Sequence, residues 1–210
     1  MDIDIVNPKV DAYLDAMVSS EDGLLLEMEE LAKEQNIPIV GRQVGSFLYQ
    51  LAITINAKRI FELGSAFGYS AYWFAKAVGK DGQVYFTDLS KDNIVLARDF
   101  IERMGFEETI SINFGDGSLI LDEVPGEFDI IFNDMEKEDY PHVIDKAYSK
   151  LRSGGLFVTD NVLWHGRVIS EDKSPATQGV REFTELLMSH SGFYTTIIPM
   201  RDGLSISVKL

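Results

Sequence analysis

Residues 128–139 read FDIIFNDMEKED, an apolar run that ends at Asp134 and is followed three residues later by Lys137. Residues 156–161 read LFVTDN, a second apolar run that also ends in polar side chains. If the two runs are parallel strands that end side by side in an α/β protein, their polar ends meet at the edge of the sheet where such sheets bind ligands. The two runs therefore predict an α/β fold with a polar site at the strand ends.

The polar ends would bring together two carboxylates and one amide oxygen, from Asp134, Asp160 and Asn161. Oxygen ligands of this kind suit hard divalent cations such as Mg²⁺ or Ca²⁺. Lys137 would stand at the rim of the site. Taken singly, Lys137 also fits a surface lysine at a helix start, and Asp160 also fits a helix cap.

The rest of the chain alternates between apolar runs and amphipathic segments. Expected helices cover residues 21–35, 45–56, 70–78, 91–104 and 140–151, and expected strands cover residues 59–63, 83–87, 109–113, 128–133 and 156–159. Such alternation indicates a doubly wound, mostly parallel sheet. Residues 194–198 and 204–208 are β-rich, and the five residues between them cannot hold a crossover helix, so they predict an antiparallel hairpin. We therefore expect one seven-stranded sheet.

Composition narrows the class of protein. A chain of 210 residues with 45% hydrophobic content is expected to form one domain, with a helical segment over residues 1–56 and an α/β core over 57–210. The absence of cysteine excludes disulfides, thiolate zinc sites and a cysteine nucleophile. The acidic start MDIDIVNPKVD is unlike a signal peptide and no apolar stretch is long enough for a membrane span, so we expect a cytoplasmic protein. A net charge of −15 disfavours nucleic-acid binding.

A glycine loop, ELGSAFGYS over residues 62–70, follows the first strand and opens a helix. Its glycines allow close backbone approach to a ligand, and free N–H groups at the helix start can hold a carboxylate or phosphate. The loop lacks the GxGxxG spacing of dinucleotide sites, which disfavours a nicotinamide cofactor. Asp88 ends the second strand, 20 residues past Gly68, where it could accept both ribose hydroxyls. Asp116 ends the next strand and could meet an adenine amino group. Taken singly, each glycine also fits an ordinary turn, and each aspartate also fits a helix cap or a solvated loop acid.

Together these motifs resemble the class I S-adenosylmethionine-dependent methyltransferases, specifically the cation-dependent O-methyltransferase family that includes catechol and caffeoyl-CoA O-methyltransferases. The resemblance covers residues 26 to 210 and is carried by AKRIFELG at 57–64, GYSA at 68–71, the 128–137 segment, DNVLW at 160–164, GRV at 166–168 and DGL at 202–204. It implies a Rossmann-like methyltransferase fold. It also implies a homodimer. The apolar residues Met28, Leu31 and 37–40 present more apolar surface than is needed to cover one face of the sheet, and the excess would be available for a dimer contact.

The resemblance also implies roles for individual residues. It makes Asp134, Asp160 and Asn161 the ligands of Mg²⁺, or of Ca²⁺ or Mn²⁺, and Lys137 the candidate general base. Residues at the positions where the family contacts S-adenosylmethionine are Glu62, Gly64, Gly68, Ser70, Asp88, Asp116, Gly117 and Asp134. The implied acceptor is a small phenolic with adjacent hydroxyls, held by the metal through two vicinal oxygens.

Some positions depart from the family pattern. Asn133 stands where many members have an apolar residue, and Met135 and Glu136 replace a common Ala-Asp pair. The catechol enzymes have an acidic substrate contact near residues 195–197, which here read TTI. Two alternatives therefore stay open: methylation of a hydroxylated uridine in transfer RNA, which the charge of −15 disfavours, and a homologue that binds the donor without turnover.

Overall fold

The structure is a computed structural model that describes residues 2–18 and 22–210. Within these ranges, seven strands form one sheet in the order β3-β2-β1-β4-β5-β7-β6. Strands β1 to β5 pair in parallel, and β7 runs antiparallel to both β5 and β6, which confirms the predicted mostly parallel sheet with a C-terminal hairpin. The strands are β1 (Arg59–Leu63), β2 (Gln83–Asp88), β3 (Ile110–Phe114), β4 (Phe128–Asn133), β5 (Leu151–Thr159), β6 (Phe193–Ile198) and β7 (Leu204–Lys209).

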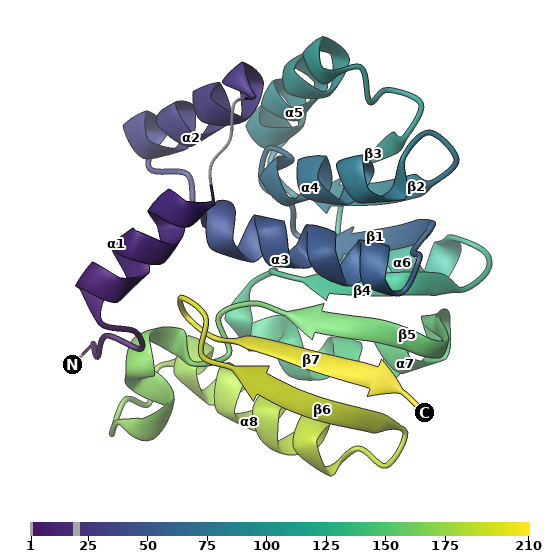
Figure 1. The fold of residues 1–210 in the computed structure, drawn as a ribbon. Coiled ribbons are helices and arrows are strands. Elements are labelled where there is room, and N and C mark those ends of the chain that lie inside the picture. The colour runs from purple at the N-terminus through teal and green to yellow at the C-terminus, as the bar shows by residue number, and fades with distance from the viewer. Residues whose placement is uncertain (1, 19–21) are drawn as a thin grey trace.

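Helices cover both faces of the sheet (Figure 1). The α-helices are α1 (Pro8–Met17), α2 (Gly23–Gln35), α3 (Gly41–Thr54), α4 (Tyr69–Val78), α5 (Lys91–Met104), α6 (Gly117–Glu123), α7 (Ile144–Lys150) and α8 (Pro175–Ser189), and the 3₁₀ segments are η1 (Lys137–Val143) and η2 (Trp164–Ile169). Because strand side chains alternate, Ile130 and Phe132 of β4 join the core cluster that includes buried residues of α2 to α5, whereas Ile131 joins the cluster on the opposite face. Burial on both faces explains the continuous apolar run Ile130–Phe132 within β4.

Several expected boundaries were wrong. The helix expected at 140–151 is a 3₁₀ segment followed by the short α7, because Pro141 has no N–H to donate to an α-helical ladder. Strand β5 begins at Leu151, so the Ser-Gly-Gly stretch at 153–155, expected to precede the strand, lies within it. Helix α3 begins at Gly41, four residues before the predicted start. Helices α1, α6 and α8 were not predicted.

Helix α2 begins at Gly23 because Asp22 caps it, accepting hydrogen bonds from the backbone N–H groups of Leu24 and Leu25. Glu21, where the helix was expected to begin, lies outside the described residues. In the described part of the chain, every helix is too short or too polar to cross a membrane.

Candidate active site

A cavity of about 1030 Å³ lies at the carboxyl ends of β1, β2, β4 and β5. The expected site residues that line it are Gly64, Ser70, Asp88, Asp116, Gly117, Asp134, Lys137, Asp160 and Asn161. Strand order explains the convergence of Gly64, Asp134 and Asp160, because β1, β4 and β5 are neighbours in the sheet and these residues follow directly after the last ladder positions of the three strands.

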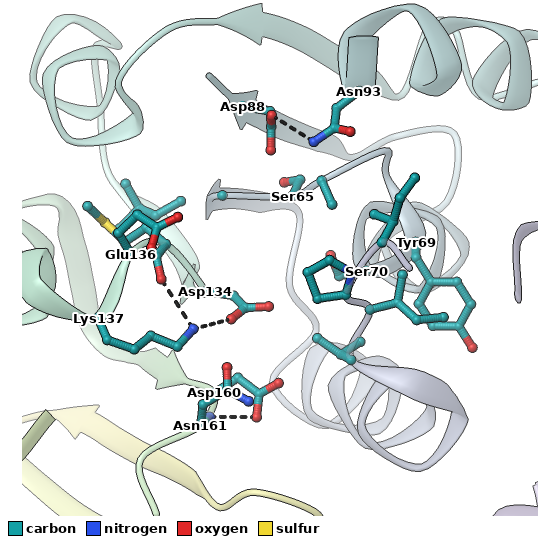
Figure 2. A pocket seen from close by; sticks show the side chains of 18 of the residues that line it. Ser65, Tyr69, Ser70, Asp88, Asn93, Asp134, Glu136, Lys137, Asp160 and Asn161 are labelled. Atoms are coloured by element: carbon teal, nitrogen blue, oxygen red, sulfur yellow. Dashed lines mark hydrogen bonds and ion pairs between the residues drawn. The ribbon is translucent and has the colours of Figure 1, made fainter. Parts of the chain in front are cut away.

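Strands β4 and β5 place the expected metal ligands side by side. Asn133 pairs with Thr159 in the parallel ladder, so the next residues, Asp134 and Asp160, leave the sheet together. Figure 2 shows both carboxylates and Asn161 turned toward the same part of the cavity. The Asn161 backbone N–H donates to Asp160 Oδ1 at 2.7 Å.

The two carboxyls destabilise each other's charged forms. Burial raises the pKa of both groups, and the charge of Asp134 helps to raise the pKa of Asp160 to about 7. Lys137 and Arg201 act in the opposite direction on both acids, since their positive charges favour the carboxylates. The site therefore concentrates the oxygens of two acids whose carboxylate forms burial disfavours.

Lys137 lies against the first of these acids. Its Nζ donates to Asp134 Oδ1 at 3.0 Å and to the backbone oxygen of Met135 at 3.2 Å. The ammonium also lies 5.1 Å from the ring centroid of Tyr140 and 5.6 Å from that of Trp164, within the range of cation–π attraction. Its side chain is only 12% exposed, so the lysine belongs to the cavity wall and is not a free surface residue.

The glycine loop forms the opposite wall. Gly64 has φ +77°, and a Cβ at this position would lie 2.8 Å from the backbone oxygen of Asp134. The glycine thus lets the end of β1 approach the end of β4 closely. Two expected donor-site residues, Glu62 and Gly68, lie behind this wall and do not line the cavity that the described residues enclose. Glu62 is fully buried, and its Oε2 accepts a hydrogen bond from Ser65 Oγ at 2.9 Å.

Two acids at the next strand ends have local structural partners as well. Asp88 Oδ1 accepts from the backbone N–H of Ser90 at 2.7 Å and from Asn93 Nδ2 at 3.1 Å. Burial nevertheless raises the pKa of Asp88, because the effect of desolvation on the carboxylate exceeds the opposing effect of these hydrogen bonds. Asp116 caps α6 by accepting from the backbone N–H of Ser118 at 2.8 Å. Asp116 thus combines a capping role with a place on the cavity wall, and Asp88 combines such a place with hydrogen bonds to the start of α5.

Sequence reasoning missed several residues of the cavity wall. Glu29 and Lys33 of α2 contribute to it, as do Tyr69 of α4 and Arg201 of the β6–β7 turn. Tyr69 donates to Glu29 Oε1 at 2.8 Å and so ties α2 to the glycine-loop helix. No strand-end rule could have found the α2 residues, since α2 precedes the first strand.

Comparison with known proteins agrees with this geometry. The sequence profile of a family described as O-methyltransferase matches residues 16–210. The chain belongs to this O-methyltransferase family. A catechol O-methyltransferase of Niastella koreensis is 33% identical over 211 residues, covering 95% of this chain and 96% of the relative. A caffeoyl-CoA O-methyltransferase of Populus trichocarpa is 28% identical and covers 88% of this chain and 81% of the relative.

A solved structure shares the whole architecture. The O-methyltransferase from Bacillus cereus, crystallised in complex with S-adenosylhomocysteine, superposes with a TM-score of 0.88 at 28% identity, covering 96% of this chain and 97% of the other. Family membership and fold thus confirm the resemblance that the sequence motifs indicated.

Proposed function

We propose that this protein transfers the methyl group of S-adenosylmethionine to one hydroxyl of a small phenolic acceptor with adjacent hydroxyls, with the help of a divalent cation. The observation that carries the proposal is the convergence of Asp134, Asp160, Asn161 and Lys137 on one side of the cavity, facing the glycine loop (Figure 2). The whole chain would act as one methyltransferase domain.

The donor would bind on the β1–β2 side of the cavity. The Bacillus cereus relative was crystallised with S-adenosylhomocysteine, which is the product that methyl transfer leaves behind. In this chain, Gly64 lines this part of the cavity, and Asp88 and Asp116 present carboxylates at successive strand ends. Asp88 would accept from the ribose hydroxyls, and Asp116 would accept from the adenine amino group.

The residues on the β4–β5 side fit a divalent cation. Asp134, Asp160 and Asn161 supply hard oxygen atoms, and burial raises the pKa of both acids, a cost to their carboxylate forms that a bound cation would offset. When bound, Mg²⁺ would fix two vicinal acceptor oxygens and make one hydroxyl more acidic. No thiol or imidazole is needed for this ligand set, in agreement with a chain that has no cysteine.

Lys137 would act as the general base. Its Nζ is held at the cavity wall by Asp134, Met135 and two aromatic rings. In its neutral form, this amine would be positioned to take the proton of the acceptor hydroxyl and become the ammonium. The acceptor oxygen then attacks the methyl carbon, and the carbon–sulfur bond of the sulfonium breaks. The negative oxygen and the positive sulfur lose their charges together, so the protein contributes mainly orientation and removal of one proton.

Charge around the cavity favours a small acceptor over RNA. Acidic residues that line the cavity besides the expected site residues are Glu29, Glu136, Glu138, Asp139 and Asp202. Such a surface repels a polyanionic backbone, and the net charge of −15 acts in the same direction.

Turnover with labelled S-adenosylmethionine, a catechol and Mg²⁺ tests the proposal. EDTA and the Asp160→Ala substitution should each abolish turnover, while calorimetry shows nearly unchanged donor affinity, because the donor would sit mainly on β1 and β2. Lys137→Ala should reduce the rate by on the order of 10²- to 10⁴-fold, with partial recovery at high pH where the acceptor hydroxyl ionises without a base. A wild-type rate that EDTA leaves unchanged would show that the metal mechanism is wrong.

A further inference from the structure

Residues 161–166 run from the end of β5 into the first half of η2 in a strained backbone conformation. Three residues that are not glycine have positive φ angles: Asn161 at +58°, Trp164 at +46° and His165 at +53°. L-residues rarely adopt this left-handed region, and clusters of such residues persist only where their surroundings impose them. The segment carries two side chains of the candidate site, the amide of Asn161 and the ring of Trp164 that lies over Lys137.

The turn between β6 and β7 holds this segment through Asp202. The Asp202 side chain is 11% exposed, and its Oδ1 accepts from the backbone N–H of His165 at 2.5 Å. The backbone oxygen of Asp202 accepts a hydrogen bond from the backbone N–H of Leu163 at 2.9 Å, and the backbone oxygen of Gly203 accepts one from the backbone N–H of Val162 at 3.0 Å. A carboxylate that accepts from a backbone N–H makes a short, charge-assisted bond, stronger than a neutral one.

The N-terminal segment holds the same residue, His165, through its carbonyl group. The backbone N–H of Ile3 donates to His165 O at 2.8 Å. A Cβ on Gly166 would lie 2.7 Å from Ile3 Cβ, so this glycine allows the N-terminal segment to pack directly on the loop. His165 is therefore fixed at its N–H by the C-terminal hairpin and at its carbonyl by the N-terminal segment.

We propose that Asp202 is a positioning residue, whose carboxylate holds residues 161–166 in the strained conformation that directs Asn161 and Trp164 into the site. The role of Asn161 as a ligand rests on the proposed function, whereas the effect on the loop itself does not. Asp202→Ala would remove the acceptor of the His165 N–H and let the backbone relax. Asp202→Asn would keep a side-chain oxygen at the same place and preserve most of the geometry.

Tryptophan fluorescence gives a direct readout of the loop. The sequence has two tryptophans, so in a Trp73→Phe background Trp164 is the sole emitter. We expect Asp202→Ala to shift Trp164 emission to the red and increase its quenching by acrylamide, and Asp202→Asn to stay near the parent. Calorimetric titration with Mn²⁺ should show an affinity loss of about 10- to 100-fold for the alanine variant, the range for residues that orient a metal ligand.

Two further measurements separate positioning from general loss of structure. Affinity for S-adenosylhomocysteine should be equal in all variants, since its expected site lies at β1 and β2. Adding His165→Gly to Asp202→Ala should restore part of the Mn²⁺ affinity, because glycine adopts a positive φ without steric cost. If Asp202→Ala alone fails to fold, the same measurements are made on this double variant.

The proposal is overturned if Asp202→Ala leaves Trp164 quenching and Mn²⁺ affinity unchanged. It is also overturned if Mn²⁺ and S-adenosylhomocysteine affinities fall together, or if neither the single nor the double variant folds, because the role is then merely structural. If the wild-type protein binds no Mn²⁺, the metal-dependent function fails, and Trp164 quenching still decides the role of Asp202.

Discussion

At the scale of single residues, Glu62 makes the stability depend on pH. The side chain is fully buried, and burial raises its pKa from 4.5 to about 7, with Asp134 adding to the shift and Ser70 and Ser65 opposing it. Between pH 4.5 and about 7 the native state keeps a proton that the unfolded state releases. The free energy of unfolding therefore decreases as pH rises through this range, by on the order of 3 kcal/mol from this group.

Glu62→Gln should remove this contribution. Urea unfolding at pH 5 and pH 8, without donor or metal, should show a smaller loss of stability between the two values for the variant than for the parent. Glu127→Gln, which removes an exposed acid from the loop before β4, serves as the control and should follow the parent. Equal pH dependence of the parent and Glu62→Gln would mean that Glu62 is ionised in the native state at both values.

Asp88 offers a test of the donor site at the same scale. Asp88→Ala should lower affinity for S-adenosylmethionine by on the order of tenfold or more, because a charged acceptor of two hydroxyl donors contributes about 1.5 to 3 kcal/mol. Calorimetry measures the effect, with Asp81→Ala in the exposed turn before β2 as the control. Unchanged affinity would place the ribose elsewhere in the cavity.

At the scale of elements, α8 supports the backbone of the candidate base. A Cβ on Gly179 would contact the Lys137 carbonyl oxygen and lie 2.9 Å from Glu138 Cα. In an exposed helix Gly→Ala stabilises by up to about 1 kcal/mol, whereas overpacking against the backbone costs about 1 to 3 kcal/mol. Because the steric cost is the larger, Gly179→Ala should lower both the melting temperature and the rate of methyl transfer.

Gly23→Ala provides the matched control. Gly23 is the first residue of α2, and a Cβ there would meet no described atom within 4 Å. Its melting temperature and rate should match those of the parent or rise slightly. A Gly179→Ala variant that behaves like Gly23→Ala would show that η1 shifts without consequence for Lys137.

The elements also show which parts of the fold are readable from sequence. β4 was predictable because burial on both faces gives it the continuous apolar run Ile130–Phe132. η1 was not, because the helical spacing of its residues hides the break that Pro141 imposes. The first half of β5 was missed because Gly154 and Gly155 look like a turn, although the ladder with β4 already includes Leu151.

At the scale of the whole molecule, strand order made most of the candidate site predictable. Parallel strands that end together bring Asp134, Asp160 and Asn161 to one cavity, which follows from the β/α alternation once β4 and β5 are taken as neighbours. Arg201 and Glu29 reach the same cavity from the C-terminal hairpin and from a helix before β1. Only the packing of these outer segments on the sheet, which periodicity does not encode, brings them there.

The expected dimer surface also changes once the whole chain is considered. Met28 is buried within the subunit, and residues 37–40 line the cavity, so their apolar character needs no partner chain. Helix α1 differs: along its described residues, none is buried, and Val10, Tyr13, Leu14 and Met17 form one apolar stripe at exposures of 42% to 62%. Figure 1 shows α1 at the edge of the molecule, away from the sheet.

We predict that this stripe pairs two subunits. Exposed apolar residues at helical spacing on one face indicate a protein contact, and a second copy of the chain presents the same stripe for a symmetric interface. Sedimentation should report roughly twice the 23.6 kDa chain mass at micromolar concentration. Tyr13→Glu combined with Leu14→Glu should shift the protein to a monomer, because four charges would then be desolvated at the two-fold contact. Val95→Glu, at an exposed apolar position on α5, serves as the control and should leave the dimer intact. A wild-type protein that is a monomer would contradict the prediction. A dimer that survives the double substitution would place the interface elsewhere.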